Sequence, residues 1–382
     1  MKVYLDNAAT TRISEMALSA MVEVMREGWG NASSVHGMGL AARDEVEKAR
    51  GIVGAQIGAA PGRVVFTSGA TEANNAILHD YAIEGMKGGC RHLVVSAIEH
   101  PSVWEYCRFL KRTHGFEISV VNPDSMGIVH AEDVEHAIRP DTAFVAVMAV
   151  NNEIGTIQPF RSIHDVCKGH GVPYHCDVTQ AVGHMTFQGM DCASFSFSAH
   201  KFHGAKGVGA LVLPTGWRFR SFLIGGSQEN GSRAGTENVP GIVSMAVALC
   251  EQTNNVQTSN RAYDLKKLLW NGLKERVGGV VLNGCMEGSV PHILNVSFEG
   301  VHGDSLVSML SELYGVYCST GSACCNGDTE PSRVLRSMGI SDSRSLGAVR
   351  FSLSRYTTRE EVEYSIQSIS KSVACLRKSL EP

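Results

Sequence analysis

The fold is decided by the stretch Ala143-Phe144-Val145-Ala146-Val147-Met148-Ala149-Val150, in which every residue is apolar. A strand with one face in water alternates apolar and polar residues, whereas a strand buried on both faces is apolar throughout. We therefore expect this stretch to be a central strand of a sheet that helices cover on both sides.

Similar short apolar runs recur on either side of this stretch, separated by amphipathic segments. The expected strands are residues 64–67, 92–96, 117–121, 172–175 and 193–197, and the expected helices between them include 101–112, 131–138 and 163–170. Strands that alternate with helices are typical of an α/β fold with a mostly parallel sheet. The first large unit of the chain is therefore predicted to be α/β.

The pattern changes after Pro240. A long helical region reaches about residue 276, strands are expected near 280–282 and 293–298, and helices near 305–313 and from 359 onward. A chain of 382 residues also exceeds the roughly 250–300 at which one hydrophobic core stops growing. We predict a large domain over residues 12–255 and a smaller α+β domain that combines 1–11 with 256–382.

Composition limits the function classes. The chain is 43% hydrophobic and 19% charged with a net charge of −4, so neither nucleic acid nor a membrane is an expected partner. No apolar run is long enough for a membrane span or signal peptide, and we expect a cytoplasmic protein with a small-molecule substrate. The 11 cysteines form no C-x-x-C pair, which disfavours a disulfide scaffold or a metal site. Most are expected to be reduced and buried.

Two strand ends carry a complementary acid and base. Asp177 follows the strand expected at 172–175, and Lys201 follows the one at 193–197. Pyridoxal phosphate needs a lysine amine to form a Schiff base and a carboxylate to keep its ring nitrogen protonated. Although an isolated lysine at a strand end is often only solvated, this pair suggests pyridoxal phosphate as cofactor.

A phosphate site is expected where Ser68-Gly69-Ala70-Thr71-Glu72 opens onto a helix. The first N–H groups of a helix and its dipole bind anions, and Ala70 and Thr71 would lie there. Ser198 and His200 could reach the same phosphate, and Gln180 could donate to the phenolate oxygen of the cofactor. Taken alone, the turn is better explained as a plain helix cap.

Two more strand ends carry His100 and Asn152. An imidazole stacked on the pyridine ring would steady the cofactor and move protons near neutral pH, although a histidine here could also simply pack. Carboxyl ends of parallel strands meet at one edge of a sheet. We expect His100, Asn152, Asp177 and Lys201 to share one rim.

The order of these motifs resembles that of cysteine desulfurases, members of the class V aminotransferase family. The matching segments are 5–11, 67–72, 98–100, 151–155, 177–180, 197–201 and 233–236. The resemblance covers nearly the whole chain. It implies fold type I of the pyridoxal-phosphate-dependent transferases, with a seven-stranded sheet, and a homodimer in which Thr236 reaches the phosphate of the neighbouring cofactor.

The resemblance also assigns roles outside the rim. Cys324 lies in the small-residue stretch at 319–327 of the smaller domain, which we expect to be a mobile surface loop. In the family the cysteine at this position attacks the substrate sulfur and carries it as a persulfide. Arg350 would bind the substrate carboxylate through its planar guanidinium. Asn31 and His36 would lie at the mouth of the site, Asn31 as a substrate contact.

The implied activity is that of a cysteine desulfurase: L-cysteine gives L-alanine, and the sulfur passes from Cys324 to an acceptor such as an iron–sulfur scaffold protein. In such a transfer Cys324 could transiently bind an iron–sulfur cluster. The alternatives are a selenocysteine lyase, another class V lyase or aminotransferase, and a regulatory protein without turnover.

The chain departs from the best-known members of the family at two places. Cys325 stands where serine or threonine is usual, which leaves its role open. Pro382 ends the sequence without the longer tail with which some relatives dock a scaffold protein, so the acceptor is less certain than sulfur removal itself.

Overall fold

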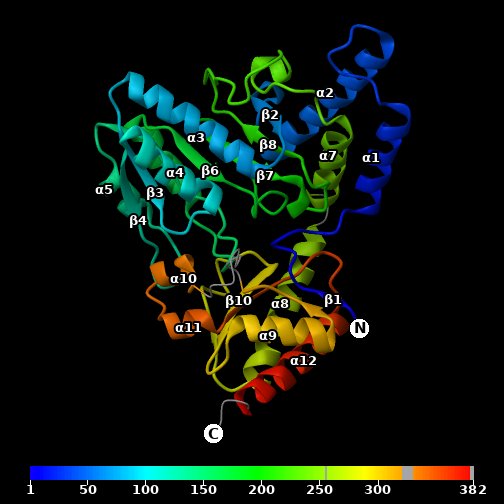
Figure 1. Ribbon diagram of the computed structural model, residues 1–382, viewed down its shortest axis with the longest axis vertical. Helices are drawn as coiled ribbons and strands as arrows, with labels where there is room; N and C mark the ends of the chain where they lie inside the picture. Colours follow the sequence, from blue (N-terminus) through cyan, green and yellow to red (C-terminus); the bar gives the residue numbers. More distant parts are fainter. Residues whose placement is uncertain (254–255, 321–329, 379–382) are drawn as a thin grey trace.

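The computed structural model describes residues 1–253, 256–320 and 330–378. Figure 1 shows a larger α/β lobe above a smaller lobe built from the end of the chain, with the N-terminal segment between the two. Cys324 and Cys325, at which sulfur chemistry is predicted, lie outside the described residues. Within those residues no helix is both long enough and apolar enough to span a membrane.

A seven-stranded sheet forms the centre of the large lobe. Its strands are β2 (Val64–Thr67), β3 (His92–Ser96), β4 (Glu117–Val121), β5 (Thr142–Ala146), β6 (Tyr174–Asp177), β7 (Ala193–Ser198) and β8 (Gly209–Val212). They lie in the order β2-β8-β7-β6-β5-β3-β4. Only β8 runs antiparallel to its neighbours, β2 and β7. The predicted α/β class with a mostly parallel sheet is therefore confirmed.

Helices bury both faces of this sheet. The large-lobe helices are α1 (Glu15–Glu27), α2 (Gly37–Ile57), α3 (Ala70–Lys87), α4 (Pro101–His114), α5 (Ala131–Ala137), α6 (Phe160–His170) and α7 (Val239–Thr253). Leu93 and Val95 of β3 pack into the cluster formed with α3 and α4, whereas Val94 points into the cluster on the opposite face. Because both faces are covered, strands such as β3 and β5 are buried at every residue.

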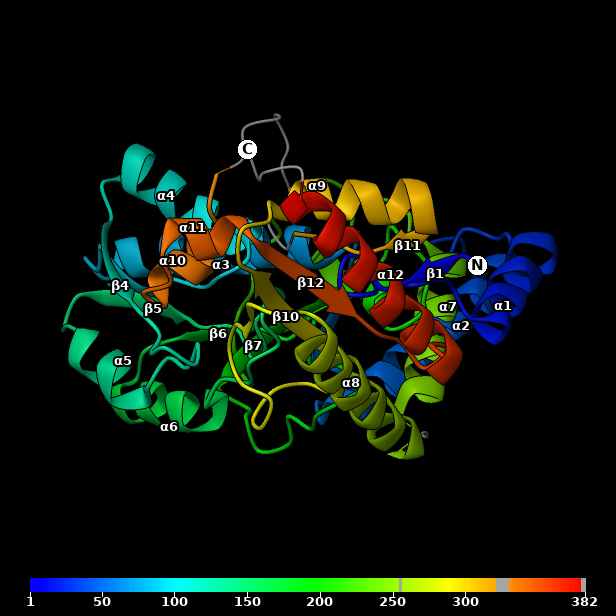
Figure 2. The ribbon, with the colours of Figure 1, turned by 90° about the horizontal axis from the view of Figure 1, so that it is seen from below.

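The small lobe has its own sheet and core. It contains α8 (Val256–Arg276), β9 (Val280–Leu282), β10 (Ile293–Phe298), α9 (Gly303–Met309), β11 (Val316–Tyr317), α10 (Arg333–Ser337), α11 (Asp342–Leu346), β12 (Ala348–Ser352) and α12 (Arg359–Lys378). β10 pairs antiparallel with β9 and β12. Figure 2 shows α8 and α12 along one side of this sheet.

The first strand of the chain belongs to the small lobe. β1 (Val3–Tyr4) pairs in parallel with β11, and Val3 and Leu5 are fully buried in the cluster formed by the small-lobe helices and strands. This separate core supports the predicted division between residues 1–11 with 256–382 and residues 12–255, which we retain as our proposal for the domain boundary.

Two expectations need correction. The strand predicted over 143–150 is regular only as far as Ala146. The N–H groups of Val147 and Ala149 still donate to carbonyls of β6, whereas the N–H of Met148 donates to the Glu99 carboxylate, at 2.8 Å, instead of to a neighbouring strand. The expectation that most cysteines are buried does not hold among those that the structure describes. Among the nine cysteines that the structure describes, all free, only Cys107, Cys167, Cys176 and Cys318 are buried.

Candidate active site

Four neighbouring strand ends assemble the candidate site. β7, β6, β5 and β3 are consecutive in the sheet, and their carboxyl ends lead to Lys201, Asp177, Asn152 and His100 respectively. Asp177 and Lys201 both act electrostatically on the pKa of His100, and Asp177 and Arg350 act on that of Lys201. The fold therefore brings these four residues to the same edge of the sheet.

Lys201 ends a short 3₁₀ turn (Ala199–Lys201) directly after β7. Its Nζ donates to the carbonyl oxygens of Ala8, at 2.7 Å, and Ala9, at 2.8 Å. Burial, with a further contribution from Arg350, lowers the pKa of Lys201 to about 8. About a tenth of its amine is therefore unprotonated at pH 7, far more than for an ordinary lysine, as a nucleophilic lysine requires.

Asp177 is buried at the end of β6 and is held at both oxygens. Its Oδ1 accepts from the N–H of Thr179 at 2.9 Å, and its Oδ2 accepts from Nδ2 of Asn74 at 2.9 Å. No basic side chain is paired with it among the described residues. A buried carboxylate held in this way can serve as the acceptor for a protonated ring nitrogen.

Asn74 is a site residue that the sequence reasoning missed. It is fully buried on α3, and its Oδ1 accepts from Ser196 Oγ and lies 2.8 Å from Nε2 of His175. Its Nδ2 also donates to Ser102 Oγ at 2.8 Å. Its sequence neighbourhood gave no signal, because these partners depend on how α3 lies across the sheet.

His100 caps the N-terminus of α4. Its Nδ1 accepts from the N–H of Ser102 at 3.1 Å, which leaves the ring proton of the neutral form on Nε2. Burial lowers the pKa of His100, so the ring is neutral at physiological pH. Ser102 contacts both His100 Nδ1 and Asn74 Nδ2, so one network holds His100 and Asp177.

A cup for an anion lies at the start of α3. The Ala70 N–H donates to Ser198 Oγ at 2.7 Å, whereas the N–H groups of Thr71 and Glu72 make none of the hydrogen bonds found among the described residues. A Cβ at Gly209 would come within 2.7 Å of the Gly69 Cα, so only glycine lets β8 approach the cup this closely. Free N–H groups at a helix start bind phosphate.

The acid beside this cup, Glu72, forms an ion pair with Arg233. Glu72 accepts from Nε of Arg233 at 2.9 Å and from the N–H of Ser68 at 2.9 Å, and its pKa is lowered by hydrogen bonds from Arg233 and Ser68 that outweigh burial. Without Arg233, a carboxylate at this position would repel a phosphate. Thr236, three residues after Arg233, is exposed.

Arg350 lies on β12 of the small lobe and faces the large one. Its Nη1 donates to the Asn152 carbonyl at 2.8 Å and its Nη2 to Asp6 Oδ1 at 2.9 Å, whereas its buried Nε has no partner among the described residues. The guanidinium thus spans the two lobes beside the rim. Its unused donor suits a carboxylate of a small substrate.

The remaining predicted residues have other partners in this structure. Gln180 Nε2 donates to the Ala8 carbonyl at 3.0 Å, and His200 Nδ1 lies 3.2 Å from Thr10 Oγ1, so both contact the segment that also holds Lys201. Asn31 and His36 are exposed between α1 and α2. Among the described contacts, Asn31 bonds only within its own turn.

A second missed residue is Glu99, which precedes His100. It is buried, and its Oε1 accepts from Ser96 Oγ at 2.5 Å and from the Met148 N–H at 2.8 Å, so it joins the ends of β3 and β5. Its Oε2 has no partner. Burial raises the pKa of Glu99 to about 8, so it is mostly protonated at neutral pH.

Glu99→Gln should change how stability depends on pH. The pKa of Glu99 is raised from about 4.3 in the unfolded chain, so the folded protein binds the extra proton between these values and loses stability as pH rises. Relative to the variant, the wild type should lose roughly 2 kcal/mol of unfolding free energy between pH 5 and 7. Urea unfolding at both pH values measures this difference.

The matched control is Glu105→Gln, which removes an exposed carboxylate from the next helix. Its unfolding free energy should depend on pH in the same way as that of the wild type. Equal pH profiles for wild type and Glu99→Gln would show that Glu99 is ionised when folded.

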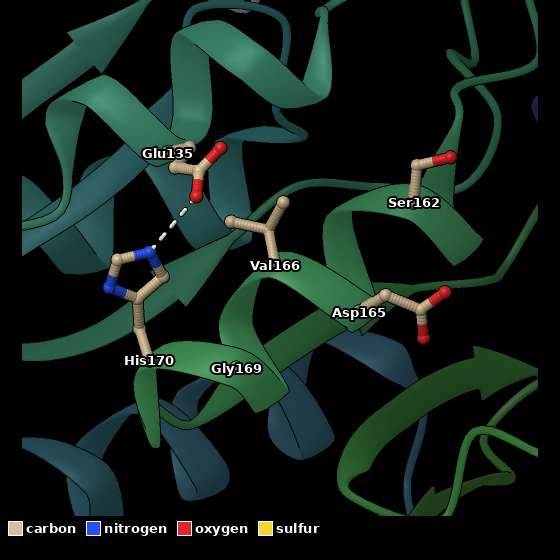
Figure 3. Close-up of a pocket in the computed structure, with 6 residues that line it drawn as sticks. All are labelled: Glu135, Ser162, Asp165, Val166, Gly169 and His170. Carbon is tan, nitrogen blue, oxygen red and sulfur yellow. Dashed lines mark hydrogen bonds and ion pairs between the residues drawn. The ribbon is translucent and has the colours of Figure 1, made fainter.

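A groove on the outer surface takes no part in this site. It has a volume of about 550 Å³ and lies between α5 and α6, where His170 Nε2 is 3.2 Å from Glu135 Oε1 (Figure 3). None of its lining residues belongs to the strand-end rim. The size of a depression is therefore a poor guide to the chemistry of this protein.

Comparison with known proteins adds independent findings. The family model for aminotransferase class V matches residues 3–364. The chain is 38% identical to the cysteine desulfurase IscS of Dictyoglomus turgidum, over 98% of this chain and 95% of that relative.

Solved structures agree with the sequence comparison. The fold resembles a NifS-like protein with a TM-score of 0.91 and 37% identity, over 98% of this chain and 100% of the other. It also resembles SspA, solved in complex with cysteine, with a TM-score of 0.81 and 31% identity, over 94% of this chain and 100% of that one.

Proposed function

The chain belongs to the class V aminotransferase family and is a cysteine desulfurase, and from this premise we propose that Lys201, Asp177, His100 and Arg350 form its active site around pyridoxal phosphate. The observation that carries the proposal is the convergence of these side chains at neighbouring strand ends and at β12. Cys324 is proposed as the sulfur acceptor on the basis of the family resemblance.

The chain's own groups fit pyridoxal phosphate. The free N–H groups at the start of α3, with Ser198, would hold the phosphate, and buried Asp177 would hold the ring nitrogen. His100, kept neutral by burial, would lie against the ring. When bound, this cofactor supplies an aldehyde for an amine and a ring that accepts electrons from the substrate Cα.

Arg350 and Lys201 would divide the handling of the substrate. Arg350 binds the carboxylate of cysteine through the donors that now meet Asp6 and Asn152, together with Nε. Lys201 removes the proton from Cα and later returns one, a task suited to an amine with a pKa of about 8. Asp177 would accept a hydrogen bond from the protonated ring nitrogen.

Sulfur transfer would then proceed at Cys324. Its thiolate forms a sulfur–sulfur bond with the substrate, the carbon–sulfur bond breaks, and its electron pair returns to the carbon skeleton, which is protonated and leaves as alanine. The terminal sulfur stays on Cys324 as a persulfide. His100 Nε2 carries the ring proton of the neutral form and is therefore a proton donor on the rim.

A homodimer and a protein acceptor complete the proposal. Large apolar side chains are exposed around α1 and α2, among them Met16, Trp29 and Val35, and Ile224 is 93% exposed. Exposed apolar surface of this kind is typical of subunit interfaces. The exposed Thr236 could then reach a phosphate in the partner subunit, and an iron–sulfur scaffold protein is our proposed acceptor.

Product analysis tests the function. The purified protein, supplied with pyridoxal phosphate, L-cysteine and a thiol reductant, should release alanine and sulfide in equal amounts. L-Selenocysteine supplied in place of cysteine should be turned over no faster. Faster release of selenide would favour a selenocysteine lyase, and an absence of alanine with a bound cofactor would favour a regulatory protein.

A further inference from the structure

α10 follows the Cys324 segment and packs against the large lobe, because Val334 and Leu335 are buried in the large-lobe core cluster. Its first residue, Arg333, adds polar contacts to that packing. Arg333 stands nine residues after Cys324 in the sequence and is the first residue of α10. Its Nη1 donates to the Ala97 carbonyl and its Nη2 to the Glu99 carbonyl. Both carbonyls belong to the connection between β3 and α4, which ends in His100. One guanidinium therefore binds the backbone directly beside His100.

An aromatic ring completes this contact. The Arg333 guanidinium lies 4.5 Å from the centre of the Trp104 ring, one turn into α4. A cation at this distance from an indole is attracted by the ring, more strongly when it is desolvated. Burial lowers the pKa of Arg333, which remains a cation. The residue is therefore held by the backbone on one side and by α4 on the other.

The residue before Arg333 is attached to a second strand end. Ser332 Oγ donates to Glu153 Oε2 at 2.5 Å, and Glu153 directly follows Asn152. The Ser332 N–H donates to Ser345 Oγ at 3.0 Å, which connects the same point to α11. In Figure 2, α10 and α11 lie against the large lobe beside α4. Two adjacent residues thus tie α10 to the ends of both β3 and β5.

On the other side of the Cys324 segment, the chain is attached to Arg350, the arginine proposed to bind the substrate. The Ser319 N–H donates to the Arg350 carbonyl at 3.2 Å, and the Arg350 N–H donates to the Ser319 carbonyl at 2.6 Å. The segment that contains Cys324 therefore begins at the strand of Arg350 and ends at the backbone beside His100. Both of its attachment points border the proposed site.

We propose that Arg333 is a positioning residue for sulfur transfer, because its contacts with Ala97, Glu99 and Trp104 fix where the Cys324 segment returns to the site. This inference rests on the proposed function, since it concerns the step at Cys324. Arg333 contacts none of the residues proposed to bind cofactor or substrate directly, so it should leave cysteine binding intact. A displaced nucleophile loses rate even when every reacting group is present.

The test is Arg333→Ala, with Arg336→Ala as the matched control. Arg336 lies on the same short helix, but it is exposed and pairs only with Asp342. Without reductant, each enzyme should form alanine in a single burst as its cysteine takes up sulfur. In Arg333→Ala the rate constant of this burst should fall roughly tenfold or more. The cysteine concentration that gives half of the spectral change of the cofactor should stay within about twofold of the wild-type value. Arg336→Ala should match the wild type both in its burst rate constant and in this concentration.

A second measurement uses the protein without cofactor. Hydrogen exchange in Arg333→Ala should accelerate together in the peptides that cover 97–104 and 332–338, whereas Arg336→Ala should accelerate only the second. Should Arg333→Ala fail to fold, Arg333→Lys is the substitute. It keeps the cation over Trp104 but cannot span both carbonyls, so its burst should lie between those of the wild type and the alanine variant.

An unchanged burst in Arg333→Ala or Arg333→Lys would overturn the inference, as would unchanged exchange over residues 97–104. A loss of cysteine affinity equal to the loss of rate would also overturn it, because the variant would then have damaged the whole site. Full sulfur release by Cys324→Ala would instead refute the proposed function, while the exchange result would still report on the Arg333 contacts.

Discussion

Lys201→Ala should eliminate turnover of cysteine, with a loss of roughly 10³-fold or more, because the substituted chain lacks both the anchor for the cofactor and the base for the Cα proton. No other amine is available to replace it among the described rim residues, which are His100, Asn152, Asp177 and Arg350. The variant should also fail to retain pyridoxal phosphate covalently after borohydride reduction, which mass spectrometry of the intact protein measures.

Lys206→Ala is the control for this experiment. Lys206 is exposed and lies five residues after Lys201, and its substitution should leave both the activity and the covalently bound cofactor unchanged. Added ethylamine should restore part of the activity of Lys201→Ala, because a small amine can enter the space of the lost side chain. Covalent cofactor in Lys201→Ala after reduction would refute the assignment.

Cys324→Ala should abolish release of alanine and sulfide from cysteine, again with an effect of roughly 10³-fold or more. Unlike Lys201→Ala, this variant should retain the cofactor covalently after borohydride reduction. Its cofactor spectrum should still change when cysteine is added. In the wild type, cysteine without reductant should add the mass of one sulfur atom to the peptide that contains Cys324. The two variants therefore separate binding of the amino acid from removal of its sulfur.

Cys325→Ala is the matched control, since it removes the adjacent thiol and leaves the proposed nucleophile. Activity within a few-fold of the wild type would make Cys325 a bystander. If Cys325→Ala lost sulfur uptake while Cys324→Ala kept it, the roles assigned to the two thiols would be reversed.

Several strands could be predicted from local sequence because runs of apolar and β-branched residues mark them. The boundaries of β2, β3 and β4 were predicted to the residue, since apolar runs with polar ends leave little choice of register. β8 was not predicted as a strand, although the family resemblance implied seven. It is short, begins with a glycine and runs against its neighbours, so neither periodicity nor length marks it.

For the candidate site as well, some residues could be predicted from local sequence and others could not. Asp177, Lys201 and His100 were found because a reactive side chain directly after an apolar run is visible in one dimension. Asn74 and Glu99 were missed, although they hold Asp177 and the strand ends in place. Their roles depend on partners from other strands and helices, and no local pattern specifies such partners.

The pairing of β1 with β11 determines when the hydrogen bonds that hold Lys201, the proposed catalytic lysine, can form during synthesis. Ala8 and Ala9, which bind Lys201 Nζ, follow directly on a strand whose partner is Val316–Tyr317. On the ribosome the large-lobe sheet could fold once β8 has emerged, but this N-terminal strand must wait for nearly the whole chain. Nascent chains stalled before residue 316 should therefore contain a folded sheet with an unsecured lysine, and stable loading of the cofactor should be a late event in biosynthesis.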